Sequence, residues 1–216
     1  MKAPDSKRRL DEANIQLGKE LWAIQSSLAI YRVIGLNAES IKSGSGKAFF
    51  GFVQNQSLGA VALGLGKVFE KEAAYELCSL SGVYRLAKQV QIQDIAAART
   101  FVGKYGVRAS EDWIKDVDQV FSAQRPRIRR HMQIIDRVRN TRLAHIEQDA
   151  PVSTLPSIAA FEELLAFAFE FHSFVNEAFL SVHSHPILDD RQIESSLLSL
   201  LKKTGVSDPV SQFKNI

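Results

Sequence analysis

Residues 157–182 are apolar on nearly every side when this stretch is drawn as a helix. Glu163, Glu170 and Glu177 recur at seven-residue spacing and leave only a narrow polar stripe. A helix on the surface of a protein has a wider polar face, so this helix is expected at the centre of a bundle. The stretch thus predicts an all-α fold, a multi-helix up-and-down bundle that covers this helix. Its predicted core positions are Phe161, Leu164, Leu165, Phe167, Ala168, Phe171, Phe174, Val175, Ala178 and Val182.

Helical periodicity also dominates the rest of the chain, and no alternating strand with a hairpin turn is visible. Pro126 cannot lie deep inside a helix but suits the first turn of one, so a new helix is predicted to begin there. Ser110, followed by Glu111 and Asp112, is predicted to cap the preceding helix. The predicted helices, some of them short, span 6–37, 47–71, 79–90, 93–104, 110–123, 126 onward, 157–182 and 191–203.

The predicted helix 47–71 contains four glycines, at positions 51, 59, 64 and 66. Each glycine lowers the stability of a helix by about 1 kcal/mol relative to alanine. Close approach of a neighbouring helix is the simplest reason to tolerate that cost. The glycines therefore predict tight helix packing along this segment.

The chain of 216 residues is long enough for one sizeable core. Residues 1–204 are predicted to form a single domain and residues 205–216 a flexible C-terminal tail. No secretory leader and no uncharged apolar run of membrane-spanning length are visible. Cys78 is the only cysteine, which excludes an intramolecular disulfide and fits a reducing cytoplasm. A cytoplasmic location without membrane contact is therefore expected.

Basic residues are concentrated in one short segment of the chain. The net charge is only +3, yet seven arginines and one acid, Asp136, lie between positions 125 and 142. Such a local excess attracts polyanions, and His131 in the same segment could assist anion binding. The arginines predicted to contact the phosphates of such a polyanion are Arg125, Arg127, Arg129, Arg130, Arg137 and Arg142.

Two other patterns suggest ligand sites but lack the neighbours that such sites need. The stretch "GSGK" at 44–47 has Ile41 and Ala48 where a phosphate-binding loop needs Gly and Ser or Thr, which favours a plain turn. The stretch "HSHP" at 183–186 has no further ligands at a recognised spacing, which favours a helix-ending turn. His172 is predicted to be an internal histidine of the bundle. No metal site and no cofactor are expected.

The stretch "RVRNTRLAH" at 137–145 contains Arg139, Asn140 and His145, a candidate phosphate-handling group. On a straight helix, side chains six residues apart point about 120° apart and lie about 9 Å apart along the axis. Arg139 and His145 can therefore meet only if the helix ends or kinks, or if two subunits share the site across a two-fold axis. A solvated basic helix face is the alternative that composition alone favours.

The stretch "RNTRLAHIE" resembles the Arg-polar-x4-His signature of the HEPN superfamily, and it is most similar to the AbiU2-like subgroup of abortive-infection proteins. Arg139, Asn140, Ala144 and His145 match that subgroup's motif by position. Two positions depart from it. Thr141 stands where the motif has Lys, and Glu147 stands where it has Asp. The glycine-bearing helix, the arginine-rich helix and the long apolar helix follow in the family's order, so the resemblance covers roughly residues 10–182.

The resemblance implies an all-α bundle that forms a homodimer and places the Arg and His of both chains in a shared cleft. It also implies a metal-independent endoribonuclease of toxin or phage-defence type, which cleaves RNA to a 2′,3′-cyclic phosphate. Arg139, Asn140 and His145 are its implied catalytic residues, and the six arginines named above would hold the RNA backbone without reading its sequence. Two alternatives remain open. One is a non-catalytic module that binds nucleic acid or a partner protein, and the other is a toxin-like subunit held inactive by a cognate antitoxin or regulatory protein.

Overall fold

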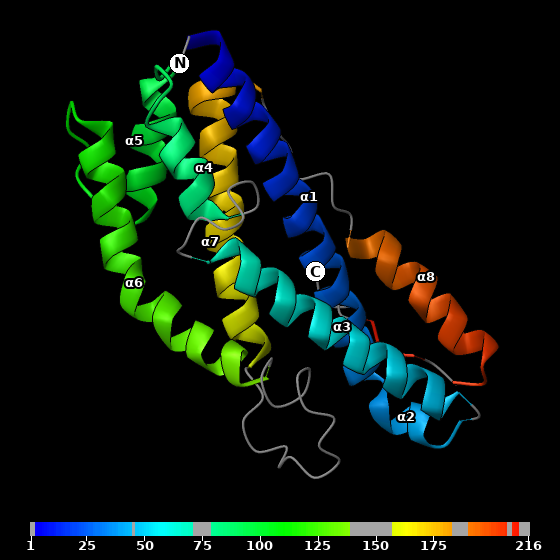
Figure 1. Ribbon diagram of the computed structural model, residues 1–216. Coiled ribbons are helices and arrows are strands. Elements are labelled where there is room, and N and C mark those ends of the chain that lie inside the picture. Colours follow the sequence, from blue (N-terminus) through cyan, green and yellow to red (C-terminus); the bar gives the residue numbers. More distant parts are fainter. Residues whose placement is uncertain are drawn as a thin grey trace.

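The computed structural model describes residues 3–44, 46–70, 79–138, 157–182, 190–206 and 209–211. The regular secondary structure in these ranges is helical, which confirms the predicted all-α fold (Figure 1). No helix in these ranges is long and apolar enough to cross a membrane. The elements, in chain order, are α1 (Ala3–Leu36), α2 (Ala38–Lys42), α3 (Lys47–Val68), α4 (Leu80–Ala87), α5 (Ile95–Lys104), α6 (Trp113–Val138), α7 (Ile158–Val175), the π-helical turn η3 (Asn176–Leu180) and α8 (Asp190–Lys203).

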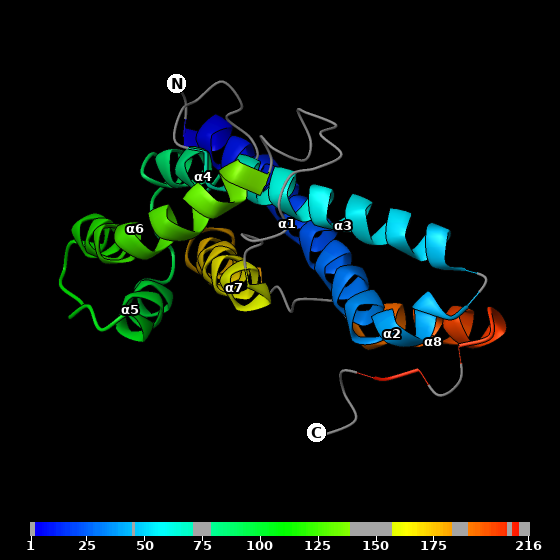
Figure 2. The ribbon, with the colours of Figure 1, turned by 90° about the horizontal axis from the view of Figure 1, so that it is seen from below.

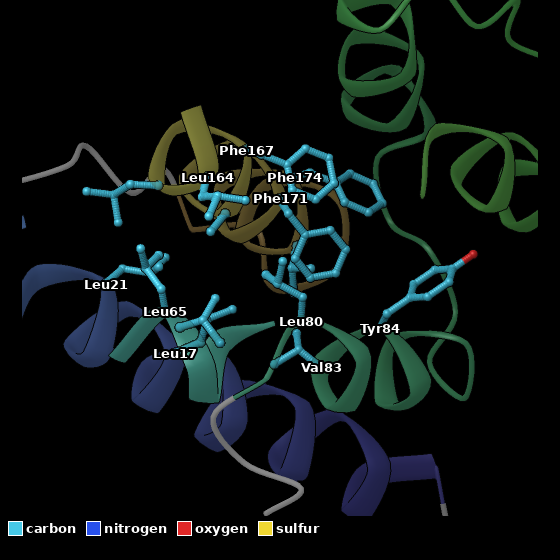
Figure 3. Close-up of a cluster of buried hydrophobic side chains, with 14 of the residues drawn as sticks. Leu17, Leu21, Leu65, Leu80, Val83, Tyr84, Leu164, Phe167, Phe171 and Phe174 are labelled. Atoms are coloured by element: carbon cyan, nitrogen blue, oxygen red, sulfur yellow. The ribbon is translucent and has the colours of Figure 1, made fainter. Parts of the chain in front are cut away.

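Helix α7 occupies the central position that its apolar pattern predicts, with α1 and α3 on one side and α5 and α6 on the other (Figure 2). The Phe171 side chain is fully buried. Its ring centroid lies 5.5 Å from that of Phe121 on α6, and 6.2 Å from those of Tyr84 on α4 and Phe101 on α5. Figure 3 shows the side chains that gather around α7 from α1, α3 and α4, among them Leu17, Leu21, Leu65, Leu80 and Val83.

We expect Phe171→Ala to lower the free energy of unfolding by about 3–5 kcal/mol, because truncating a buried Phe leaves a cavity in addition to the lost transfer energy. Three helices contact this ring, so no single one can move in to fill the space. Urea denaturation would measure the change as a lower midpoint. Phe169, half-buried on the same helix, is the matched control, and Phe169→Ala should cost clearly less. Equal losses would contradict the central position of the Phe171 face.

The close approach predicted from the glycines of α3 is confirmed at one position. A Cβ added at Gly64 would lie 2.9 Å from Cδ1 of Ile24 and 3.3 Å from Oε1 of Glu20, both on α1. Gly64 therefore lets the α1 and α3 backbones come closer than a side chain would permit. Gly51 is different, because a Cβ added there meets nothing within 4 Å.

The predicted helix break at Pro126 is wrong, because α6 runs without interruption from Trp113 to Val138 with the proline inside it. A proline in a helix removes one hydrogen bond and bends the axis, and the α6 ribbon does bend near its middle (Figure 1). Pro126 faces solvent. Buried Val120 before it and Ile135 after it belong to the same core, so packing on both sides offsets the local cost.

The start of α6 also differs from the prediction. The helix begins at Trp113, and the Asp112 side chain accepts a hydrogen bond from the Lys115 backbone N–H at 3.1 Å. Ser110 instead binds the buried carboxylate of Asp116, through its backbone N–H at 2.6 Å and its hydroxyl at 2.8 Å. Asp112 thus replaces Ser110 as the cap, while Ser110 fixes the loop before the helix.

A smaller core cluster joins α8 to the end of α1 and the start of α3. Val206, just after α8, is buried in it. The chain turns there through Gly205, whose φ of 89° is one that residues with a side chain rarely adopt. Asn37 then holds the backbone of Val210 with two hydrogen bonds, of 2.6 Å and 3.1 Å. The described parts of the predicted tail, residues 205–206 and 209–211, therefore lie against the bundle.

Candidate nucleic-acid interface

The predicted catalytic residues Arg139, Asn140 and His145 lie outside the described residues, as does the predicted RNA-binding residue Arg142. Helix α6 is described as far as Val138, the residue directly before Arg139. The part of the interface that the structure describes therefore lies on α6, the helix that precedes the motif in the chain.

The other predicted RNA-binding arginines, at 125, 127, 129, 130 and 137, are all exposed along α6. Arg130 and Arg137 are seven residues apart, so they share one face, within about 20° of each other. That face is opposite the one on which Ile128 and Ile135 pack into the core. No ion pair joins Arg125, Arg129 or Arg130 to a carboxylate in the part of the chain that is described. These three guanidinium groups are available to phosphates.

Arg127 is arranged differently, because Glu163 of α7 binds it. Its Nε donates to Glu163 Oε2 at 2.8 Å, and its Nη2 lies 2.7 Å from Oε1, so the pair is bidentate. Nε2 of His131 lies 2.9 Å from the same Oε2. The hydrogen bond from Arg127, followed by the one from His131, holds the pKa of Glu163 below its usual value. Phosphate must therefore compete with Glu163 for Arg127.

Sequence reasoning missed Glu163 as a member of this interface. It placed Glu163 on the polar stripe of the central helix and the arginines on another helix. Only the docking of α6 on α7 brings the two sets together. The seven-residue spacing of Glu163, Glu170 and Glu177 was the signal that could have identified it. Polar side chains on a buried helix need hydrogen-bond partners from neighbouring helices.

An open pocket of about 230 Å³ lies between α6 and α7 beside this ion pair. We call it the α6–α7 pocket. Tyr105 and Phe167 line it, with ring centroids 5.4 Å apart in an edge-to-face arrangement. The Tyr105 hydroxyl donates to Glu170 Oε2 at 2.8 Å, and burial is the main cause that raises the pKa of Tyr105. Gln124, Arg127, His131 and Glu163 complete the polar part of the lining.

His172 lies in the bundle, where the sequence predicts it. Its ring lies so close to α1 that a Cβ added at Gly18 would be 2.7 Å from Nε2. Burial lowers the pKa of His172, which favours the neutral imidazole. Asn176, in the π-helical turn, lies 3.5 Å from Nδ1 and accepts a 2.7 Å hydrogen bond from the buried side chain of Asn14. This histidine belongs to an internal polar network and is no candidate for proton transfer to RNA.

The remaining sequence patterns contribute little to the interface. The "GSGK" stretch follows α2 and leads into α3, so a helix and not a strand precedes it. The "HSHP" stretch lies outside the described residues. Where the structure is described, no group of three or more His, Cys, Asp or Glu side chains could hold a metal ion.

Comparison with known families places these features in context. A family model described as AbiU2, of the HEPN class, matches residues 8–196. The match spans most of the chain and includes α6, the "RVRNTRLAH" stretch and α7. No curated protein and no solved structure matches the chain.

Proposed function

Because this chain belongs to the AbiU2 family of HEPN domains, we propose that it is a cytoplasmic, metal-independent endoribonuclease of the toxin or phage-defence type. The observation that carries the proposal is the junction between α6 and the motif. Helix α6 exposes Arg125, Arg129 and Arg130 without a carboxylate partner among the described residues, and it is described as far as Val138, the residue directly before Arg139. A polyanion attracted to α6 is thereby led toward the residues proposed to cut it.

The proposed reaction uses the RNA's own 2′-hydroxyl as the nucleophile. A base removes the hydroxyl proton, the 2′-oxygen bonds to the adjacent phosphorus, the bond to the 5′-oxygen breaks, and an acid protonates that oxygen. The products are a 2′,3′-cyclic phosphate and a 5′-hydroxyl. His145 can serve as base or acid near neutral pH. Arg139 stabilises the charge that grows on the phosphate oxygens, and Asn140 orients His145 or holds one of those oxygens.

The experiment that tests this proposal is digestion of RNA by purified protein in EDTA, with His145→Ala as the comparison. We expect the wild-type protein to cleave and the variant to leave the RNA intact. Cleavage that EDTA abolishes, or equal cleavage by both proteins, would contradict the proposal.

The arginines of α6 lead to a prediction about salt. Arg129→Ala combined with Arg130→Ala should weaken binding to all RNA sequences alike and reduce the slope of log affinity against log salt by about 1 to 2 units, because two phosphate contacts are lost. Fluorescence anisotropy at several salt concentrations would measure it. The matched control is Arg99→Ala with Arg108→Ala, two exposed arginines outside α6. An unchanged slope in the α6 variant would remove these arginines from the RNA path.

The homodimer belongs to the proposal, and the outer face of α3 supports it. This helix has no charged residue between Lys47 and Lys67. It exposes 56% of Phe49, 63% of Phe52 and 46% of Leu63. Such apolar exposure marks a binding surface, and an uncharged face is compatible with its own copy across a two-fold axis.

A non-catalytic binding module is the second candidate, and the motif's departures from the family pattern favour it. Thr141 replaces the Lys of that pattern, and Glu147 replaces the Asp. On this proposal the same basic surface holds RNA or an acidic partner protein, such as a cognate antitoxin or regulatory protein, without cleavage. RNA binding that falls with salt, together with intact RNA after digestion, would favour the nucleic-acid form. No RNA binding at low salt would favour the protein partner.

A further inference from the structure

The α6–α7 pocket has the size and lining of a site for a flat aromatic ring. A cavity of about 150 Å³ can accept benzene, and this pocket measures about 230 Å³. Two aromatic side chains, Tyr105 and Phe167, line it together with the aliphatic Ile128 and Leu164. Aromatic side chains that line an open pocket are the surfaces on which unpaired nucleobases stack in RNA-binding proteins.

The charges around the pocket favour an uncharged ring over a phosphate. Glu163 has a side chain that is 39% exposed, and its carboxylate would repel a phosphate that entered. The bidentate pairing with Arg127 cancels the net charge of the two groups. It also fixes a guanidinium group at the pocket, and bases stack on the planes of such groups. The Gln124 amide adds one donor and one acceptor for the edge of a base.

A phosphate-binding group lies beside the pocket on the same helix. Arg130 is exposed on α6 one turn after Arg127, about 60° from it around the helix, and has no carboxylate partner among the described residues. A strand held by Arg130 would pass the mouth of the pocket, which Arg127 lines. Arg129 lies on the far side of α6 from the pocket. Helix α6 then continues for eight residues from Arg130 to Val138, the residue before the motif.

We propose that the α6–α7 pocket binds one unpaired nucleobase of the RNA strand and so selects the sequence at a fixed distance from the cut. The inference rests on the proposed function for the identity of its ligand. The Tyr105 ring and the Arg127 guanidinium provide the stacking surfaces, because Phe167 is only 5% exposed and forms the floor of the pocket. Gln124 and Glu163 discriminate between bases.

Binding to a short single-stranded RNA with 2′-O-methyl ribose throughout tests the proposal, because this RNA cannot be cleaved. Each base is removed in turn to leave an abasic sugar with its phosphate. For the wild-type protein we expect one position at which removal lowers affinity about 5- to 150-fold, the range for loss of one stacked base. Ala166→Leu narrows the pocket from an exposed position, and Gln124→Ala removes its amide. Ala166→Leu should bind the intact RNA weakly and no longer respond to base removal at that position. Gln124→Ala should still respond to base removal there but should lose the preference among the four bases.

Ala159→Leu is the matched control, because it makes the same change on an exposed residue of α7 one heptad earlier, away from the pocket lining. It should retain the dependence on the base. Equal dependence in Ala166→Leu, or no sensitive position at all, would overturn the proposal. Competition by a nucleoside monophosphate, without a sensitive position in RNA, would overturn the assignment to a strand and identify a free nucleotide as the ligand.

The two proposals fail separately. Cleavage in the digestion assay without any base-dependent position leaves the ribonuclease intact and removes the nucleobase site. A sensitive position that Ala166→Leu abolishes, in a protein that never cleaves RNA, leaves the nucleobase site and removes the ribonuclease.

Discussion

Replacing His145 or Arg139 with alanine should lower the rate of RNA cleavage about 10²–10⁴-fold, because each removes one component of transition-state stabilisation. Single-turnover kinetics with labelled RNA in EDTA would measure the loss. Binding to uncleavable RNA should change little in His145→Ala, since the proposal assigns the affinity to the α6 arginines. Thermal unfolding of both variants is the control for folding. Full activity in His145→Ala would end the ribonuclease interpretation.

The chemistry of the products gives the same prediction a second readout. Because the proposed nucleophile is the substrate's own hydroxyl, the new 3′ end should carry a 2′,3′-cyclic phosphate. RNA with one 2′-deoxyribose at the cut site should still bind but should not be cleaved. Cleavage of that substrate would require a different nucleophile and would contradict the proposed roles of His145 and Arg139.

The second large effect is expected at the outer face of α3. Phe49→Glu combined with Phe52→Glu should convert the protein from about twice the chain mass of 24.1 kDa to the single chain. A two-fold interface presents each substitution twice and buries unpaired charges. Light scattering would measure the mass. Ile15→Glu, at a residue 49% exposed on α1, is the control and should leave the assembly unchanged. A wild-type protein that is already a monomer would contradict the shared site.

Mixing the Arg139→Ala and His145→Ala proteins would then reveal how the site is shared. If Arg139 and His145 of one chain act together, every mixed dimer has two broken sites and stays inactive. If the pair is formed across the two-fold axis, a mixed dimer contains one intact site. The mixture should then recover activity that neither variant has alone. The Phe49 and Phe52 variant should abolish this recovery.

The position of α7 could be predicted because its apolar residues cover almost the whole helix surface. Phe171 shares one helix face with Leu164, Ala168 and Val175, so its burial follows from the pattern. The helix break at Pro126 was wrong for a related reason. Local propensity favours a break at this proline. However, Val120 before it and Ile135 after it are both buried in the same core. Tertiary packing outweighs the local cost.

The contacts of the interface could not be predicted in the same way. The bond between Arg127 and Glu163 joins residues 36 positions apart, and no periodicity within either helix specifies the rotation at which α6 meets α7. The same limit applies to the glycines of α3. Gly64 and Gly51 are equivalent in the sequence pattern, yet only Gly64 faces α1. Composition thus indicated which helices would pack, while their relative rotation decided which residues meet.

The internal network of Asn14, Asn176 and His172 has a consequence for how the chain avoids misfolding. Asn14 is fully buried between Leu10 and Leu17 on the inner face of α1. The His172 ring of α7 packs on Gly18, one turn further along α1, where a Cβ would lie 2.7 Å from Nε2. A slip of one helical turn, about 5.4 Å, would set the Asn14 amide against hydrocarbon and leave Asn176 opposite a leucine. Each buried amide without a partner costs about 1–3 kcal/mol. The network therefore raises the free energy of any shifted alignment of these two mainly apolar helices. We expect α1 and α7 to dock in a single register.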